Sequence, residues 1–333
     1  MVPTFIGITL VCFTLTRILP GGPVDLQVMA MRGVGGSGGG AAASANQVSE
    51  AFKKKLNEEM GFDRPIYEQY WTWFWEKRLG MLAKSYTEPT KTAWEKIRSR
   101  IPVSIWFGLC SFVITYLVCI PLGIAKALRH RQAFDMGSSL VVFMAYAIPS
   151  FALAMLLKVL FCGTVEGFPK VFPLNGISSE FAENAGFWIW FKDRAWHMFL
   201  PVCCYVSGSF AMLTLLMKNS LLDQISADYV RTVIAKGGTR RRAIWLHAFR
   251  NALIPITTGL GHIIGLLFAG SIVIETIFGI PGMGSLSFDA LNGRDYTVFM
   301  ALLALTASFQ LAGNLISDFL YMIVDPRIDF SKK

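Results

Sequence analysis

Long runs of apolar residues alternate along this chain with shorter polar segments. The hydrocarbon core of a bilayer is about 30 Å thick, so a helix needs about 20 mainly apolar residues to cross it. The pattern predicts six membrane-spanning helices, at residues 2–19, 102–125, 137–162, 197–217, 252–277 and 297–323. We therefore expect an all-α polytopic membrane protein.

The polar segments set the domain organisation that we expect. A first transmembrane helix at 1–19 precedes a long loop with a helical insert at 20–101. A core of five helices then occupies 102–323 and contains a polar loop at 218–251, and a short tail covers 324–333. No basic residue precedes the first span and no cleavage site lies close after it, as a signal peptide would require, so we expect this helix to be retained.

Composition agrees with a membrane protein and indicates its orientation. Of 333 residues 53% are hydrophobic and 16% charged, against about 25% charged in soluble domains. The net charge of +9 is concentrated in the 126–136 loop, the 218–251 loop and the tail, which the positive-inside rule places in the cytoplasm with both termini. The long 20–101 loop is then periplasmic. Basic residues confined to short loops beside apolar spans argue against nucleic-acid binding.

The 218–251 loop carries seven Lys or Arg and two acids. Tyr229, Val233 and Lys236 follow helical spacing, and Gly237 with Gly238 supplies the positive φ at which a short helix ends. This pattern predicts a helix-turn-helix that contacts a cytoplasmic protein. The alternative is a solvated basic loop that only sets membrane orientation.

The order of residues in this loop resembles the EAA loop of permease subunits in bacterial ABC importers of the oligopeptide/dipeptide family. The matching residues are Asp228, Tyr229, Val230, Arg231, Thr232, Ala235, Lys236, Gly237, His247, Arg250, Asn251, Ala252 and Pro255. The resemblance implies that Asp228, Tyr229, Val230, Arg231, Ala235, Lys236 and Gly237 couple the permease to its ATPase. In that interpretation Tyr229, Val230 and Val233 give apolar docking area, and Arg231 and Lys236 meet acidic or carbonyl groups.

Other stretches resemble the same family. They are E-x-x-F-x-x-P-G-x-G at 275–284, R-D-Y at 294–296, P-G-G-P-V-D at 20–25 and D-P-R-I-D-F at 325–330. The double glycine, the glycine-rich insert and the tail look closest to the Yej-type branch, whose permeases are associated with microcin C and oligopeptide uptake. The resemblance implies the MetI-like fold of type I importers.

The resemblance also implies an assembly in the bacterial inner membrane. Its partners would be a second permease in a heterodimer, ABC ATPase subunits, a periplasmic solute-binding protein, membrane lipid and a peptide substrate. Arg240–Arg242 would suit either the ATPase or anionic lipid. We expect no cofactor and no enzymatic activity, because the chain has no Walker A, Gly-x-Ser-x-Gly or HExxH motif and no metal-ligand spacing of Cys or His.

Two features outside the basic loop leave alternatives open. A carboxylate inside a membrane span, such as Glu275, costs a few kcal/mol and is a functional hypothesis by default. Glu275, Pro281 and Gly282 are therefore candidates for gating, or for a structural role in which the carboxylate pairs within the following Gly/Pro turn. The aromatic cluster at 67–75 forms either an interfacial belt or a lid that contacts substrate.

Two rival classes of function remain to be weighed. A secondary transporter or channel would need a network of intramembrane acids or histidines and would often show internal repeats, neither of which the sequence presents. A membrane-embedded enzyme would need a nucleophile or metal constellation.

Overall fold

The computed structural model describes residues 1–18, 54–55, 57–58, 62–183, 185–259 and 270–324. Over these ranges the secondary structure is helical, and β-pairing is limited to two isolated bridges. Contacts divide the chain into two compact units. One comprises residues 1–100 and 286–308, and the other 101–285 and 309–333. The glycine-rich insert and the D-P-R-I-D-F tail lie outside the described residues.

The first unit is built around aromatic packing on the first helix. Its short helices are α1 (Val2–Ile18), α4 (Ile66–Trp71) and η1 (Thr72–Glu76). Phe13 of α1 is fully buried, its ring lies 5.4 Å from that of Tyr70, and its cluster includes Trp73, Met300 and Ala304. The aromatic cluster noted in the sequence is thus split, because Tyr70 and Trp73 face this core while Tyr67, Trp71 and Trp75 are exposed.

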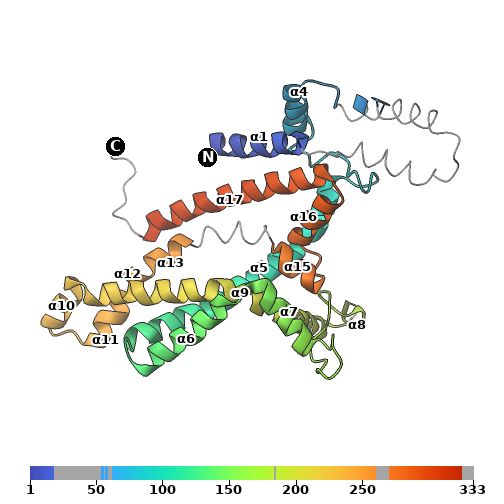
Figure 1. Cartoon of the computed structure of the whole chain (residues 1–333). Coiled ribbons are helices and arrows are strands. Elements are labelled where there is room, and N and C mark those ends of the chain that lie inside the picture. Colours follow the sequence, from blue (N-terminus) through green and yellow to red (C-terminus); the bar gives the residue numbers. More distant parts are fainter. Residues whose placement is uncertain (19–53, 56, 59–61, 184, 260–269, 325–333) are drawn as a thin grey trace. The chain divides into compact units, whose positions relative to one another are not determined.

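The second unit is organised along one long helix, α9 (Phe187–Ser226), whose 40 residues extend about 60 Å. Helices α10 and α11 lie at one end of α9, and α7 and α8 at the other (Figure 1). The helices of the chain from α5 onward, besides α9, are α5 (Ala93–Leu128), α6 (Ala133–Ala147), α7 (Ser150–Phe161), α8 (Glu180–Glu183), α10 (Asp228–Ala235), α11 (Arg240–Arg242), η2 (Ala243–Ala248), α12 (Phe249–Ala252), α13 (Ile254–Thr258), α15 (Ile272–Phe278), α16 (Met283–Asn292) and α17 (Tyr296–Val324).

Two buried apolar clusters lie along α9. The cluster nearer its first half contains Met198 and Val206 with residues of α5, α7 and α15. The cluster nearer its last turns contains Met217 and Leu221 with residues of α5, α10, η2, α12 and α13. Ser220 also donates a hydrogen bond of 2.8 Å from its Oγ to the backbone carbonyl of Ala252. The second cluster therefore joins the basic loop firmly to two membrane helices.

The membrane spans agree with the predicted class but not in every detail. Within the described residues three helices are long and apolar enough to cross a membrane, over Ala93–Leu128, Phe187–Ser226 and Tyr296–Leu320. The predicted span at 137–162 is not one straight helix: α6 and α7 meet at 93°. The bend falls at Ile148–Pro149, because proline has no N–H and pushes the preceding residue out of the helical region. The predicted span at 252–277 lies partly outside the described residues.

Candidate functional site

The predicted helix in the basic loop is present as α10. It begins after Ala227, whose backbone is extended, and carries Asp228 in its first turn, where a negative charge favours the helix dipole. It ends at a turn in which Gly237 has φ +87° and its N–H donates to the carbonyl of Ile234 at 3.0 Å. The helix and its glycine stop, both predicted from the sequence, are thus confirmed.

A second helical segment follows after the two glycines. Thr239 caps its start by accepting a hydrogen bond of 3.3 Å on Oγ1 from the N–H of Arg242. The segment then runs through α11, the π-helical η2 and α12. The predicted helix-turn-helix arrangement is therefore what the structure shows.

The apolar face of α10 is turned into the protein. Val230 is only 3% exposed and belongs to the cluster formed with Met217 and Leu221 of α9. Tyr229 and Val233 pack against the same cluster, and the Tyr229 hydroxyl donates 2.7 Å to Oε1 of Gln224. The side chain of Val230 is thus covered by the chain's own core, and its part in coupling to an ATPase stays a prediction. Tyr229 and Val233 are half-covered in the same way.

The opposite face of α10 is open. Asp228, Arg231, Thr232 and Ala235 are exposed and follow the i, i+3, i+4, i+7 spacing that places residues on one side of a helix. Arg231 Nη1 lies 3.6 Å from Asp228 Oδ1, an exposed pair that leaves both groups available. Lys236 and Gly237 are exposed just beyond the helix, and Ile234 adds an apolar side chain that is 44% exposed. The surface is thus mainly polar with a small apolar component.

Glu275 lies in the first turn of α15 and is buried against the segment that leads to α16. Its Oε1 accepts a hydrogen bond of 3.0 Å from the N–H of Ser271, and its Oε2 accepts one of 2.7 Å from the N–H of Ser285. Ser271 precedes α15 and Ser285 lies in the first turn of α16, so one carboxylate ties the starts of these two helices together. The geometry supports the structural alternative for Glu275.

The glycines of this turn make room for that carboxylate. A Cβ on Gly282 would lie 2.6 Å from Glu275 Cδ, and one on Gly284 would lie 2.6 Å from the N of Ile272. Gly279 ends α15 with φ +61°. Pro281 is half-buried beside Gly282, and the Met283 N–H donates 2.8 Å to Ser104 Oγ on α5. This segment is therefore closely packed.

Asp295 is a buried carboxylate that the sequence analysis did not single out. It accepts hydrogen bonds from the hydroxyls of Ser85 and Thr87 and from the backbone N–H groups of Tyr86, Thr87 and Val298. Lys96 Nζ lies 3.8 Å from Asp295 Oδ2. Glu88 is a neighbouring carboxylate that also pairs with Lys96, and hydrogen bonds from Lys91 and from Lys96 lower its pKa below the usual value. The R-D-Y stretch at 294–296, which matches the family pattern, was the feature of the sequence that could have pointed to Asp295. Asp295 fastens the loop at 85–87 to the start of α17.

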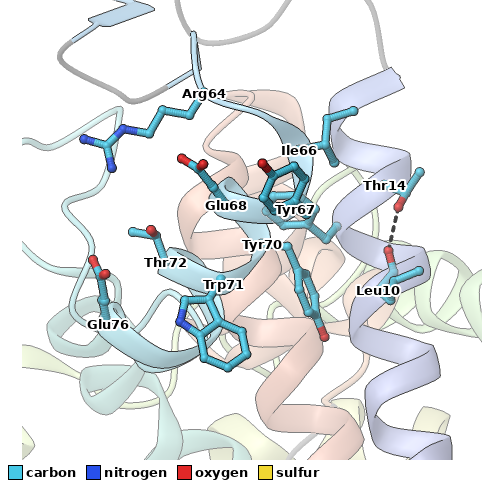
Figure 2. Close-up of a pocket in the computed structure, with 11 residues that line it drawn as sticks. Leu10, Thr14, Arg64, Ile66, Tyr67, Glu68, Tyr70, Trp71, Thr72 and Glu76 are labelled. Atoms are coloured by element: carbon cyan, nitrogen blue, oxygen red, sulfur yellow. Dashed lines mark hydrogen bonds between the residues drawn. The ribbon is translucent and has the colours of Figure 1, made fainter.

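A cavity of about 870 Å³ lies in the first unit between α1 and the α4–η1 segment. Figure 2 shows Leu10 and Thr14 on one side and Arg64, Glu68 and Glu76 on the other, with Tyr67 and Tyr70 between them. The Tyr70 hydroxyl lies 2.9 Å from Thr9 Oγ1 and so belongs to the wall. The cavity places the exposed aromatic side chains beside charged ones, which suits an interfacial belt as well as a lid.

Within the part of the chain that the structure describes, no group of three or more His, Cys, Asp or Glu is placed to hold a metal ion. His197, for example, is occupied, with Nδ1 2.9 Å from the backbone carbonyl of Asp193. His262 lies outside the described residues.

The features assembled above are those of an importer permease, and comparison with known families agrees. The family described as "binding-protein-dependent transport system inner membrane component" matches residues 119–330, more than half of the chain. The chain belongs to this family. It is a multi-pass inner-membrane permease subunit of an ABC importer, a class that works with an ATPase, a solute-binding protein and a second permease.

Individual relatives match over nearly their whole length. The inner membrane ABC transporter permease protein YejB of Escherichia coli O157:H7 is 35% identical, with 99% of this chain and 96% of the relative covered. The peptidoglycan transport system permease protein YejB of Agrobacterium fabrum is 33% identical over 100% and 96%. The dipeptide transport system permease protein DppB of Escherichia coli K12 is 33% identical over 100% and 97%. The predicted family is confirmed.

Proposed function

We propose that this chain is one of two membrane subunits of an importer for oligopeptides or peptide-like compounds, and that α10 is the element on which a cytoplasmic ATPase acts. The names of its relatives support the substrate class, since they refer to dipeptide, oligopeptide and peptidoglycan transport. Compounds of the microcin C type are included, in keeping with the likeness to the Yej-type branch.

The observation that carries the coupling proposal is the division of α10 into two faces. Its inner face is held by the cluster around Val230, Met217 and Leu221, so that α10 cannot move without α9. Its outer face presents Arg231, Ala235 and Lys236 to a partner. A short helix held on one side and open on the other suits the transfer of force from a soluble subunit to a membrane helix.

In the proposed mechanism ATP hydrolysis resides in a separate subunit. Closure of the ATPases pushes on the outer face of α10, contacting Arg231, Lys236 and the exposed part of Ile234. Gly237 permits a close approach of backbones at the end of the helix. Because α10 is packed against α5 and α9, these helices turn with it and change the side of the membrane to which the pathway opens.

The same proposal assigns the topology. Both termini and the basic loop at 218–251 lie in the cytoplasm, and residues 20–101 lie in the periplasm, where a solute-binding protein delivers the peptide. The six spans expected from the sequence are an even number, which places both termini on the same side of the membrane. Glu275 of α15, with Pro281 and Gly282 of the turn that follows, then lies near the periplasmic side and shapes the pathway there.

A carrier driven by an ion gradient is less well supported. Such a carrier needs intramembrane groups that are free to bind and release protons. Lys158 donates to Asn175 Oδ1 at 2.9 Å and to the backbone carbonyl of Ile277, and Glu275 accepts from two backbone N–H groups. Both are committed to holding the turn around α15.

The test is uptake by reconstituted vesicles that contain this chain together with the second permease and the ATPase encoded beside it, with ATP inside and the binding protein outside. ATP-dependent peptide uptake that disappears when this chain is omitted is the expected result. Uptake driven by a proton gradient in the absence of ATP would overturn the proposal.

A further inference from the structure

A cluster of charged and hydroxyl side chains joins three helices next to the basic loop. We call it the Asp135 cluster, and its members are Lys126, Asp135, Ser138, Ser139 and Lys218. Lys126, at the end of α5, is completely buried, and its Nζ donates to the Asp135 carbonyl at 3.0 Å, to Ser138 Oγ at 2.9 Å and to Ser139 Oγ at 2.7 Å. An ammonium has three N–H donors, so Lys126 is fully satisfied by α6.

The Asp135 carboxylate extends the cluster to α9. Lys218 Nζ lies 2.7 Å from its Oδ1 and 2.8 Å from its Oδ2, and the Arg131 N–H donates to Oδ2 at 3.1 Å. Lys126 Nζ and His130 Nδ1 lie 3.4 Å from Oδ1 and Oδ2 respectively. Asp135 itself is only 4% exposed. Removing one member of such a buried pair leaves a charge without a partner, which is costly.

Lys218 links the Asp135 cluster to the residues of α9 that hold α10. It lies on α9 between Met217 and Leu221, whose side chains form the apolar cluster that holds Val230 of α10. That apolar cluster draws residues from α5, α9, α10, η2, α12 and α13. The Asp135 cluster adds α6, which leads through the 93° bend into α7.

We propose that Asp135 is a positioning residue for transport: it fastens α6 to α5 and α9, so that a displacement of α10 is passed to the bent α6–α7 pair. This inference rests on the proposed function, since it assumes that an ATPase moves α10. Without the Asp135 cluster, α9 would still follow α10, but α6 would lag behind it. ATP would then be hydrolysed with less transport.

The experiment uses the complete importer in proteoliposomes and measures peptide taken up per ATP hydrolysed. The variants are Asp135→Asn, Lys218→Met and the charge-keeping Lys218→Arg. The matched control is Asp193→Asn, which makes the same chemical change as Asp135→Asn. Asp193 lies on α9, as Lys218 does, but near the other end of that helix, and it accepts two hydrogen bonds from Ser179. Membrane amount of the permease and co-purification of the ATPase are measured for each.

We expect Asp135→Asn and Lys218→Met to lower uptake per ATP about tenfold, within the usual range of coupling between two sites. The ATPase should remain bound and active, and Lys218→Arg and Asp193→Asn should retain the wild-type ratio. An unchanged ratio in Asp135→Asn would overturn the inference. So would failure of both Asp135→Asn and Lys218→Met to accumulate in the membrane, because the cluster would then serve folding alone. Absence of ATP-dependent uptake in the wild-type vesicles would instead refute the proposed function.

Discussion

Replacing Glu275 with glutamine distinguishes a structural role, in which the carboxylate holds the starts of α15 and α16 together, from a role in carrying protons. We call the structural role the brace interpretation. The carboxylate accepts backbone hydrogen bonds of 3.0 Å and 2.7 Å from the two helix starts. A glutamine has one acceptor oxygen, so it keeps one of these bonds and turns its NH₂ group toward the other N–H. Hydrogen bonds to charged groups contribute about 1.5–3 kcal/mol each, and the variant should lose about that much free energy of unfolding.

The assay is unfolding of the purified permease in mixed detergent micelles, followed by tryptophan fluorescence, together with ATP-dependent uptake. Glu180→Gln is the control, because the same chemical change at an exposed glutamate of α8 should alter stability by no more than about 0.5 kcal/mol. Gly282→Ala should produce the same defect as Glu275→Gln, since its Cβ would lie 2.6 Å from the carboxylate carbon.

The brace interpretation would be refuted if Glu275→Gln unfolded like the wild type. A wild-type stability combined with loss of uptake would show that the charge acts in transport directly. A parallel loss of stability in Glu275→Gln and Gly282→Ala, with uptake reduced only as far as folded protein is reduced, is the result that the geometry predicts.

Three further experiments test the surroundings of α10 and α17. Gly237→Val should weaken ATPase binding, because a β-branched residue at φ +87° costs about 1–3 kcal/mol, whereas Gly237→Asn should be tolerated; co-purification of the ATPase measures both. Arg231→Glu combined with Lys236→Glu should abolish that co-purification and leave the amount of permease in the membrane unchanged, since both side chains are exposed. Asp295→Asn should lower the free energy of unfolding by about 1.5–3 kcal/mol, and an unaltered unfolding curve would contradict its assigned role.

Features that depend on near neighbours in sequence were predicted well. The fold class follows from apolar runs of membrane-spanning length, which any lipid-facing helix requires. The end of α10 at Gly237 follows from the conformational freedom of glycine. The break at Ile148–Pro149 was also encoded locally, and it was missed because the apolar run continues through it.

The tertiary structure decided which face of each helix is covered and which distant groups meet. The sequence presents Val230 and Ile234 of α10 alike as apolar residues, and only the cluster at the end of α9 makes the first a core residue and leaves the second exposed. Asp135 meets Lys218 across 83 positions, and Asp295 meets Ser85 across 210. A local pattern can show that a charge is unusual, but its partner is set by the packing of helices, because that packing alone brings such groups within hydrogen-bond distance.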